Sequence, residues 1–129
     1  MGRPEDDDLL DDLVTVSVIT ARLGLTRVQR VHELMRSSPP LPRPVKVLPR
    51  VQLWSWREVA AWAQNVGREV VEPSEYVPAQ VLRERLDLDP NELAEGESVS
   101  SRRGKGRERL WSWRDAERVW IDRINRPRR

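Results

Sequence analysis

The pentapeptide Leu-Trp-Ser-Trp-Arg occurs twice in this chain, at residues 53–57 and again at residues 110–114. Four of the six tryptophans lie in these two segments, in a protein with no phenylalanine and one tyrosine. Because an internal repeat constrains the architecture of a chain before any other pattern does, this pentapeptide is the first feature to explain.

The repeat extends beyond the pentapeptide. The apolar residues of segment 13–26 coincide with those of segment 76–89 at an offset of 63, whereas the pentapeptides are 57 residues apart. Matched order with one internal deletion indicates duplication of a unit of roughly sixty residues. We therefore expect two small domains, residues 13–72 and 73–129, after an acidic and disordered segment of residues 1–12.

The first copy begins with two predicted helices. Thr15 is a good N-cap for a helix over residues 16–23, and Gly24 supplies the permissive backbone that follows a helix end. Thr26 is a good N-cap for a second helix over residues 27–36. Two short helices joined by a turn that contains glycine predict a helix-turn-helix.

The second of these helices is amphipathic. The side chains expected to face the core are Val28, Val31, Leu34 and Met35, and the polar residues between them are expected to point outward. His32 is the one histidine of the chain. We interpret it as structural or solvent-facing, without a metal or catalytic role.

An extended connection and a hairpin follow. Residues 39–44 include four prolines and cannot form a helix. Segments 45–48 and 51–54 flank Pro49-Arg50, which predicts a β-hairpin.

The pentapeptide then falls at the junction between that hairpin and a third helix. Ser55 is expected to cap this helix with Glu58 as its capping-box partner, and Ser112 with Asp115 repeats the device in the second copy. The expected buried faces consist of Trp56, Val59, Ala60, Ala63 and Val66 in the first copy and of Trp113, Ala116 and Trp120 in the second. The tryptophans are therefore interpreted as core residues rather than as ligand contacts.

This order of elements resembles the winged-helix DNA-binding domains of the excisionase and MerR type. The resemblance rests on ITARLGLTRVQRVHEL (residues 19–34), PRPV (42–45) and LWSWREVAAW (53–62), and it covers nearly all of residues 13–66. It implies a second helix in the major groove, a hairpin or wing along phosphates or the minor groove, and no enzymatic activity. The expected fold class is mainly α with small β-hairpins (α+β), built as two tandem winged helix-turn-helix domains.

Charge is distributed in alternating blocks. Residues 13–72 carry nine basic and four acidic side chains, and residues 98–129 carry eleven and four, whereas residues 1–12 and 73–97 each have a net charge of −5. Basic blocks of this size are typical of proteins that bind nucleic acid, although a solvated surface also produces them.

The candidate contacts follow from the expected helices and wings. Base edges are expected to be contacted from the start of the second helix, by Arg27, Gln29 and Arg30, because arginine and glutamine match the hydrogen-bonding groups of guanine and adenine. Phosphates are expected to be contacted by Arg36, Arg43, Lys46 and Arg50. The second copy adds a basic wing with Arg102, Arg103, Lys105 and Arg107, which suits phosphates or the minor groove.

The second copy differs where the second helix should be. That segment begins with Asp89 as N-cap and Pro90 at the first helical position, and it is expected to continue to Gly96. Phosphates would repel its carboxylates, so the second copy is interpreted as a degenerate domain that holds the DNA backbone chiefly with its wing.

The sequence thus predicts a sequence-specific double-stranded DNA-binding protein, either a transcriptional regulator or an excisionase-like architectural factor of a phage, plasmid or integrating element. Whether it represses, activates or directs excision, and whether it dimerises, stays open. With no cysteine, one histidine, no glycine-rich phosphate loop and no metal-spaced cluster, we expect no enzyme, cofactor or metal. We also expect no membrane span and a cytoplasmic, nucleoid-associated protein. The alternative is a protein-interaction module on a winged-helix scaffold, with the acidic second copy contacting a protein partner.

Overall fold

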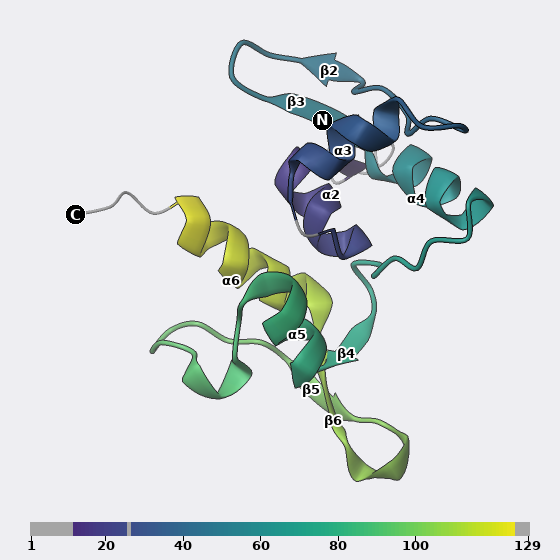
Figure 1. Cartoon of the computed structure of the whole chain (residues 1–129). Coiled ribbons are helices and arrows are strands. Elements are labelled where there is room, and N and C mark those ends of the chain that lie inside the picture. The colour runs from purple at the N-terminus through teal and green to yellow at the C-terminus, as the bar shows by residue number, and fades with distance from the viewer. Residues whose placement is uncertain (1–11, 26, 126–129) are drawn as a thin grey trace, which may run out of the picture. The chain divides into compact units, whose positions relative to one another are not determined.

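The structure is a computed structural model that describes residues 12–25 and 27–125, without the Arg107 side chain. The chain divides into two compact units, Met1–Val70 and Val71–Arg129, two residues before the boundary expected from the sequence (Figure 1). The described residues form five α-helices and two antiparallel three-stranded sheets. The α+β class is therefore confirmed at this level.

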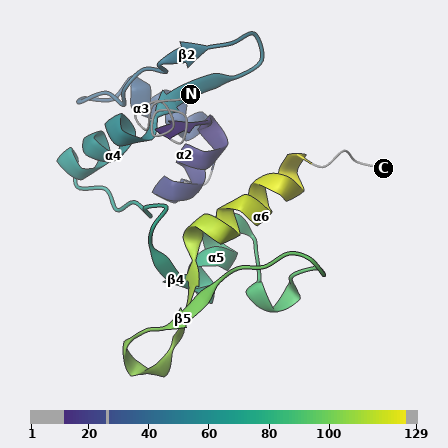
Figure 2. The ribbon, with the colours of Figure 1, turned by 180° about the vertical axis from the view of Figure 1, so that it is seen from behind.

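The first unit contains three helices and one small sheet. Its elements are β1 (Leu13–Val14), α2 (Val16–Leu23), α3 (Gln29–Met35), β2 (Lys46–Val47), β3 (Gln52–Ser55) and α4 (Trp56–Asn65). The central strand of its sheet is β3, with β1 on one side and β2 on the other. The hairpin of β2 and β3 extends away from the helices in both ribbon views (Figures 1 and 2).

Helix α2 has the limits and caps expected from the sequence. The Val18 backbone N–H donates a hydrogen bond of 3.4 Å to Thr15 Oγ1. At the other end Gly24 takes a left-handed conformation with φ of 67°, which a residue with a Cβ adopts only at a cost.

Helix α3 is shorter than expected, because it begins at Gln29 and not at Arg27. The expected cap, Thr26, lies outside the described residues, and the N-cap is Val28, which forms no side-chain cap bond. The Arg30 N–H bonds to the carbonyl of Arg27 at 3.1 Å, a tight turn that precedes regular helix. The expectation that Val28 faces the core is wrong, since it is 44% exposed, whereas Val31 is fully buried.

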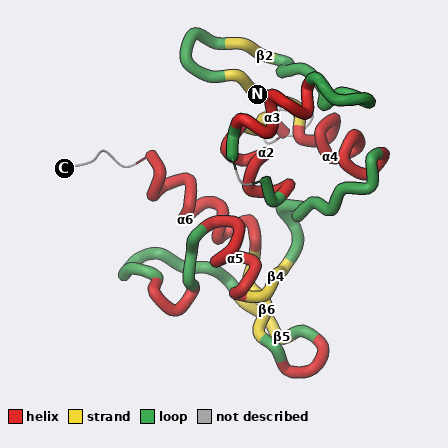
Figure 3. Tube along the Cα trace, in the orientation of Figure 1, coloured by secondary structure: helices red, strands yellow, loops and turns green. Residues whose placement is uncertain are grey.

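The proline-rich connection after α3 is irregular along its whole length, as expected (Figure 3). Leu41 is buried within it, and its N–H donates to the Leu34 carbonyl at 2.9 Å. Two buried indoles also hold this segment. Trp54 Nε1 donates to the Pro42 carbonyl at 3.0 Å and Trp62 Nε1 to the Pro39 carbonyl at 2.9 Å. These bonds satisfy carbonyl groups that no helix or strand could pair.

The expected β-hairpin is present and is called hairpin 1 (residues 45–54). Its register pairs Lys46 with Leu53 and Val47 with Gln52. The Leu48 N–H donates to the Val51 carbonyl at 2.8 Å across the two-residue turn. The sequence did not predict strand β1, which adds to the other side of β3.

Helix α4 begins at Trp56 with Ser55 as its cap, as expected, and Ser55 Oγ accepts from the Glu58 N–H at 3.4 Å. Asp12 adds to this cap, because it accepts a short hydrogen bond from Ser55 Oγ and a 2.8 Å bond from the Arg57 N–H. The expected disorder of residues 1–12 is therefore wrong for Asp12, and residues 1–11 lie outside the described residues.

The second unit repeats the order of elements of the first. Its elements are β4 (Tyr76–Pro78), α5 (Ala79–Leu86), the 3₁₀ helix η1 (Pro90–Glu92), β5 (Ser101–Arg103), the 3₁₀ helix η2 (Lys105–Arg107), β6 (Arg109–Ser112) and α6 (Trp113–Asn125).

The structural repeat has the same two offsets as the sequence repeat. Helix α5 has the limits of α2 shifted by 63 residues, and β6 has those of β3 shifted by 57. The pair Val14 and Trp54 in the first sheet corresponds to Val77 and Trp111 in the second. Both pairings join the strand before the first helix to the strand that carries the pentapeptide.

The second unit departs from the first after α5. Asp89 caps η1 by accepting a 2.9 Å bond from the Asn91 N–H, and Pro90 opens it, as expected. The expected continuation to Gly96 is wrong, because helical structure ends at Glu92. Between α5 and β5 the second unit thus has one 3₁₀ turn where the first has α3.

The core of the second unit is centred on the second tryptophan of its pentapeptide. Trp113 and Ala116 have no exposed surface, and Trp113 Nε1 donates to Glu117 Oε2 at 2.6 Å. Trp111 and Trp120 are only half-buried, so the expectation that Trp120 lies on the buried face holds only in part.

We expect Trp54→Ala to destabilise the first unit by about 3–5 kcal/mol, because it removes a fully buried indole and leaves the Pro42 carbonyl without its donor. Urea denaturation followed by far-UV circular dichroism measures this loss. Leu48→Ala, at an exposed position of the same hairpin, is the control and should change the midpoint little. Equal effects of the two substitutions would contradict the assigned core.

Candidate nucleic-acid interface

The positions expected to contact DNA lie at the surface. All of those whose side chains are described are exposed, namely Arg27, Gln29, Arg30, Arg36, Arg43, Lys46, Arg50, Arg102, Arg103 and Lys105. Arg107 belongs to η2, and its side chain is outside the described part. Exposure leaves these groups accessible to a large partner.

The three candidates for base contacts lie around the start of α3. Arg27 precedes the helix, and Gln29 and Arg30 occupy its first two positions. Arg30 forms an ion pair of 2.5 Å with Glu33, in which both side chains are about half exposed. An exposed pair of this kind contributes little free energy, so Arg30 can exchange Glu33 for another acceptor at small cost.

Hairpin 1 and α3 border the same hollow, which has a volume of about 430 Å³. His32 lines it from α3, Val16 from α2, and residues 47–52 line it from the hairpin. The position of His32 beside the hairpin could not be predicted, because it depends on where the chain returns after the proline-rich connection. The hollow brings Arg50 and His32 to one surface.

Basic side chains predominate from the end of α3 to the start of α4, in a stretch that begins just after the exposed Glu33. Residues 34–57 contain five basic side chains and no acidic one. Lys46 lies in β2, Arg50 in the hairpin turn and Arg43 in the preceding connection. A surface with one sign of charge attracts a polyanion over several ångströms and raises the rate of encounter.

The second hairpin, hairpin 2 (residues 101–110), is also basic. Arg102 pairs with Leu110, as Lys46 pairs with Leu53, so both modules carry a cation opposite the leucine of the pentapeptide. The Arg102 guanidinium lies 4.1 Å from the centroid of the Tyr76 ring on β4. This cation–π contact orients the side chain and leaves it exposed.

Arg109 is a further basic residue of hairpin 2 that the sequence-based list of contacts omitted. Its guanidinium lies 5.6 Å from the centroid of the Trp111 ring, and the side chain is exposed. Arg109 was omitted because the sequence does not show that Trp111 is half-buried and that its ring lies beside the Arg109 guanidinium.

The turn of hairpin 2 is built with glycine. Gly104 donates to the Glu108 carbonyl at 2.8 Å, and a Cβ at Gly104 would lie 2.7 Å from Leu110 Cδ1. Gly106 has φ of 81°, a left-handed conformation that disfavours other residues. The close turn thus presents Lys105 on a defined backbone.

Asp115 ties hairpin 2 to helix α6. Its Oδ2 accepts a 3.0 Å bond from the Ser100 N–H, directly before β5, and its own N–H donates to Ser112 Oγ at 3.3 Å. The hydrogen bonds from Ser100, first from its side chain and then from its backbone, lower the pKa of Asp115. Asp115 therefore positions the basic hairpin rather than contacting a partner.

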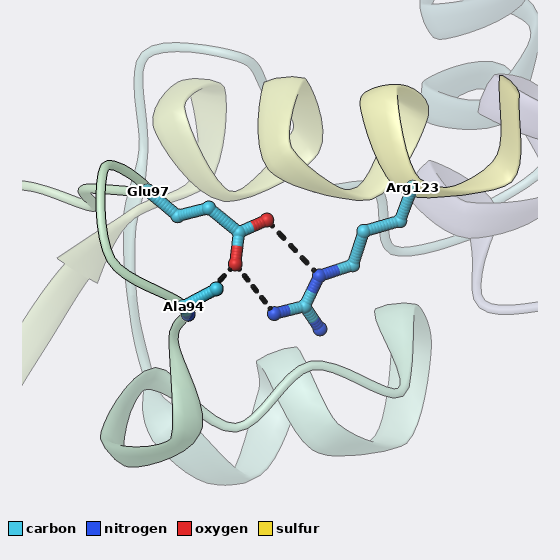
Figure 4. Close-up of polar contacts among 3 residues, drawn as sticks. All are labelled: Ala94, Glu97 and Arg123. Carbon is cyan, nitrogen blue, oxygen red and sulfur yellow. Dashed lines mark hydrogen bonds and ion pairs between the residues drawn. The ribbon is translucent and has the colours of Figure 1, made fainter. Parts of the chain in front are cut away.

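Two carboxylates of the acidic segment that replaces α3, those of Asp89 and Glu97, are bonded within their own unit. Asp89 caps η1, and its Oδ2 lies 3.5 Å from Arg83 Nε. Glu97 accepts bonds from the Ala94 N–H and from two nitrogens of Arg123, at 2.8 to 3.2 Å (Figure 4). The hydrogen bonds from Arg123 to Glu97 raise the pKa of Arg123. They also hold the end of the acidic segment against α6.

No family model, no curated protein and no solved structure matches this chain. Among residues 12–25 and 27–125 no helix is long and apolar enough to cross a membrane. In the same described residues no group of three histidine, cysteine, aspartate or glutamate side chains could hold a metal ion.

We expect the stability advantage of the native protein over Asp115→Asn to depend on pH. The folded-state pKa of Asp115 is lowered, so its carboxylate stabilises the fold above the unfolded-state pKa, and this contribution is lost as the pH falls through the folded value. Urea unfolding of both proteins between neutral pH and pH about 3 measures the difference.

Glu92→Gln is the control for this experiment, because it removes one exposed carboxylate without touching the Ser100 contact. A difference between the native protein and Asp115→Asn that is constant with pH would contradict the role assigned to the ionised group.

Proposed function

We propose that this protein binds double-stranded DNA as a regulator or architectural factor without enzymatic activity. The observation that supports this proposal best is that most of the basic candidate residues are exposed on two equivalent hairpins and at the start of one short helix, with Arg36 at the end of that helix and Arg43 in the connection after it. Stretches of exposed arginine and lysine displayed on hairpins and helix starts suit the phosphate spacing and base edges of a duplex.

The proposal gives the two units different tasks. In the first unit, Arg27, Gln29 and Arg30 contact base edges and hairpin 1 contacts the adjoining backbone, in the manner of a winged helix-turn-helix. The second unit has no counterpart of α3 in its described part, so it contributes backbone contacts from Arg102, Arg103 and Lys105. Sequence preference then comes from one unit, while both contribute to affinity.

The acidic second copy as a contact for a protein partner is the weaker alternative. Asp89 and Glu97, two of its carboxylates, already accept hydrogen bonds or pair with arginines of the same unit. Breaking such contacts to bind a partner would offset part of the gain.

The first test is the salt dependence of binding by the full chain to duplex DNA. We expect the logarithm of the association constant to fall steeply with the logarithm of salt concentration, with about 0.9 in slope for each phosphate contact. The triple substitution of Arg102, Arg103 and Lys105 by alanine should lower the slope by about one for each residue and weaken all duplexes alike.

Arg83→Ala is the matched control, because Arg83 is an exposed arginine of the same unit that pairs with Asp89. It should leave the slope unchanged. A slope near zero for the native chain would refute binding through phosphates.

The second test concerns sequence preference, measured by selecting bound duplexes from a random pool. Arg30→Lys keeps the charge but loses the planar fork that matches guanine, so it should relax the selected motif and leave the salt slope intact. Discrimination at the affected base should fall by about 1–3 kcal/mol. If Arg30→Lys and Arg27→Ala both select the same motif as the native chain, the start of α3 does not contact base edges.

A further inference from the structure

The end of hairpin 1 carries apolar side chains that the fold does not bury. Val47 is 66% exposed, Leu48 39% and Val51 36%, and they surround the turn at Pro49 and Arg50. Exposed apolar groups clustered at the end of a projecting element commonly mark a contact site. The three side chains border the hollow that His32 and Val16 also line, but the fold covers them only in part.

Hairpin 2 provides a comparison within the same chain. It occupies the equivalent place in its module, but residues 101–109 contain five basic residues, one acidic residue and no large apolar one. An apolar tip is therefore not required to make this kind of hairpin. The difference between the two tips calls for a functional reason.

We propose that the tip of hairpin 1 inserts into the minor groove and that Leu48 acts as a wedge that unstacks one base step. This inference rests on the proposed binding to duplex DNA. Leucine and proline side chains are among those that proteins insert between base pairs from the minor groove, with arginine or lysine beside them. Arg50 in the turn and Lys46 in β2 supply those cations.

The positive charge of hairpin 1 and its flanks favours a nucleic acid over a protein surface as the occupant. Residues 34–57, which contain the whole of hairpin 1, carry five basic side chains and no acidic one. Duplex DNA matches both the positive charge and the apolar side chains of the tip. Its phosphates are anionic, and its stacked base pairs form an apolar interior that becomes accessible when the duplex bends. Since the minor groove is about 6 Å wide, the two-residue turn and its flanking side chains are the part that enters.

The test uses the full chain and duplexes that carry 2-aminopurine at successive positions of the selected site. Its fluorescence rises where stacking is lost. The native chain should raise it at one step, and Leu48→Ser should abolish the rise while keeping binding to an intact duplex within a few-fold. The native chain should also bind a duplex with a mismatch at that step about tenfold more tightly than the intact one, and Leu48→Ser should lose this preference.

Val45→Ser is the matched control, because Val45 is an exposed valine of the same hairpin at its opposite end. It should unstack the base step as the native chain does. Binding without any fluorescence change, or an unchanged rise in Leu48→Ser, overturns the wedge and leaves the proposed function standing. A change of oligomeric state in Leu48→Ser, seen by sedimentation without loss of unstacking, overturns it in favour of a contact between protein molecules. Failure of the native chain to bind any duplex overturns both proposals.

Discussion

Burial of indole rings where a strand becomes a helix is the interaction on which both units depend. In the first unit Trp54 lies in the central strand β3 and Trp56 opens α4, and both are buried. Strand β3 pairs with β1 on one side and with β2 on the other. A module of this size buries little apolar surface, so it offsets the loss of chain entropy only with large aromatic contacts at its centre. The same junction in the second unit is centred on Trp113.

Much of this architecture was predictable, because several residues have strong local roles. Capping serines, a glycine after α2 and four prolines in residues 39–44 each restrict the backbone through short-range physics. Strands β1 and β4 escaped prediction, since segments of two or three residues show no periodicity. The start of α3 was misjudged for a related reason. A threonine that can cap a helix does not determine where the helix begins when a tight turn precedes it.

The surface was predictable as a set of residues but not as an arrangement. The basic residues named as candidate DNA contacts were expected at the surface, and those whose side chains are described are exposed. The position of His32 across a hollow from hairpin 1 and the stacking of Arg102 on Tyr76 depend on contacts between distant segments. The two units also differ in structure in one segment. Both units have the strands and the closing helix. Between α2 and hairpin 1 the first unit has helix α3, whereas between α5 and hairpin 2 the second unit has an acidic turn. Duplication followed by change in that one segment accounts for two units of unequal structure.

The proposed function requires the cations of both modules, each built around buried tryptophans, to bind one duplex. Amide chemical-shift changes in the full chain, followed by NMR as duplex DNA is added, test it most directly. The account predicts shifts at the start of α3 and along both hairpins, with residues 87–97 unaffected. Shifts confined to residues 87–97, or none at either hairpin, would contradict it.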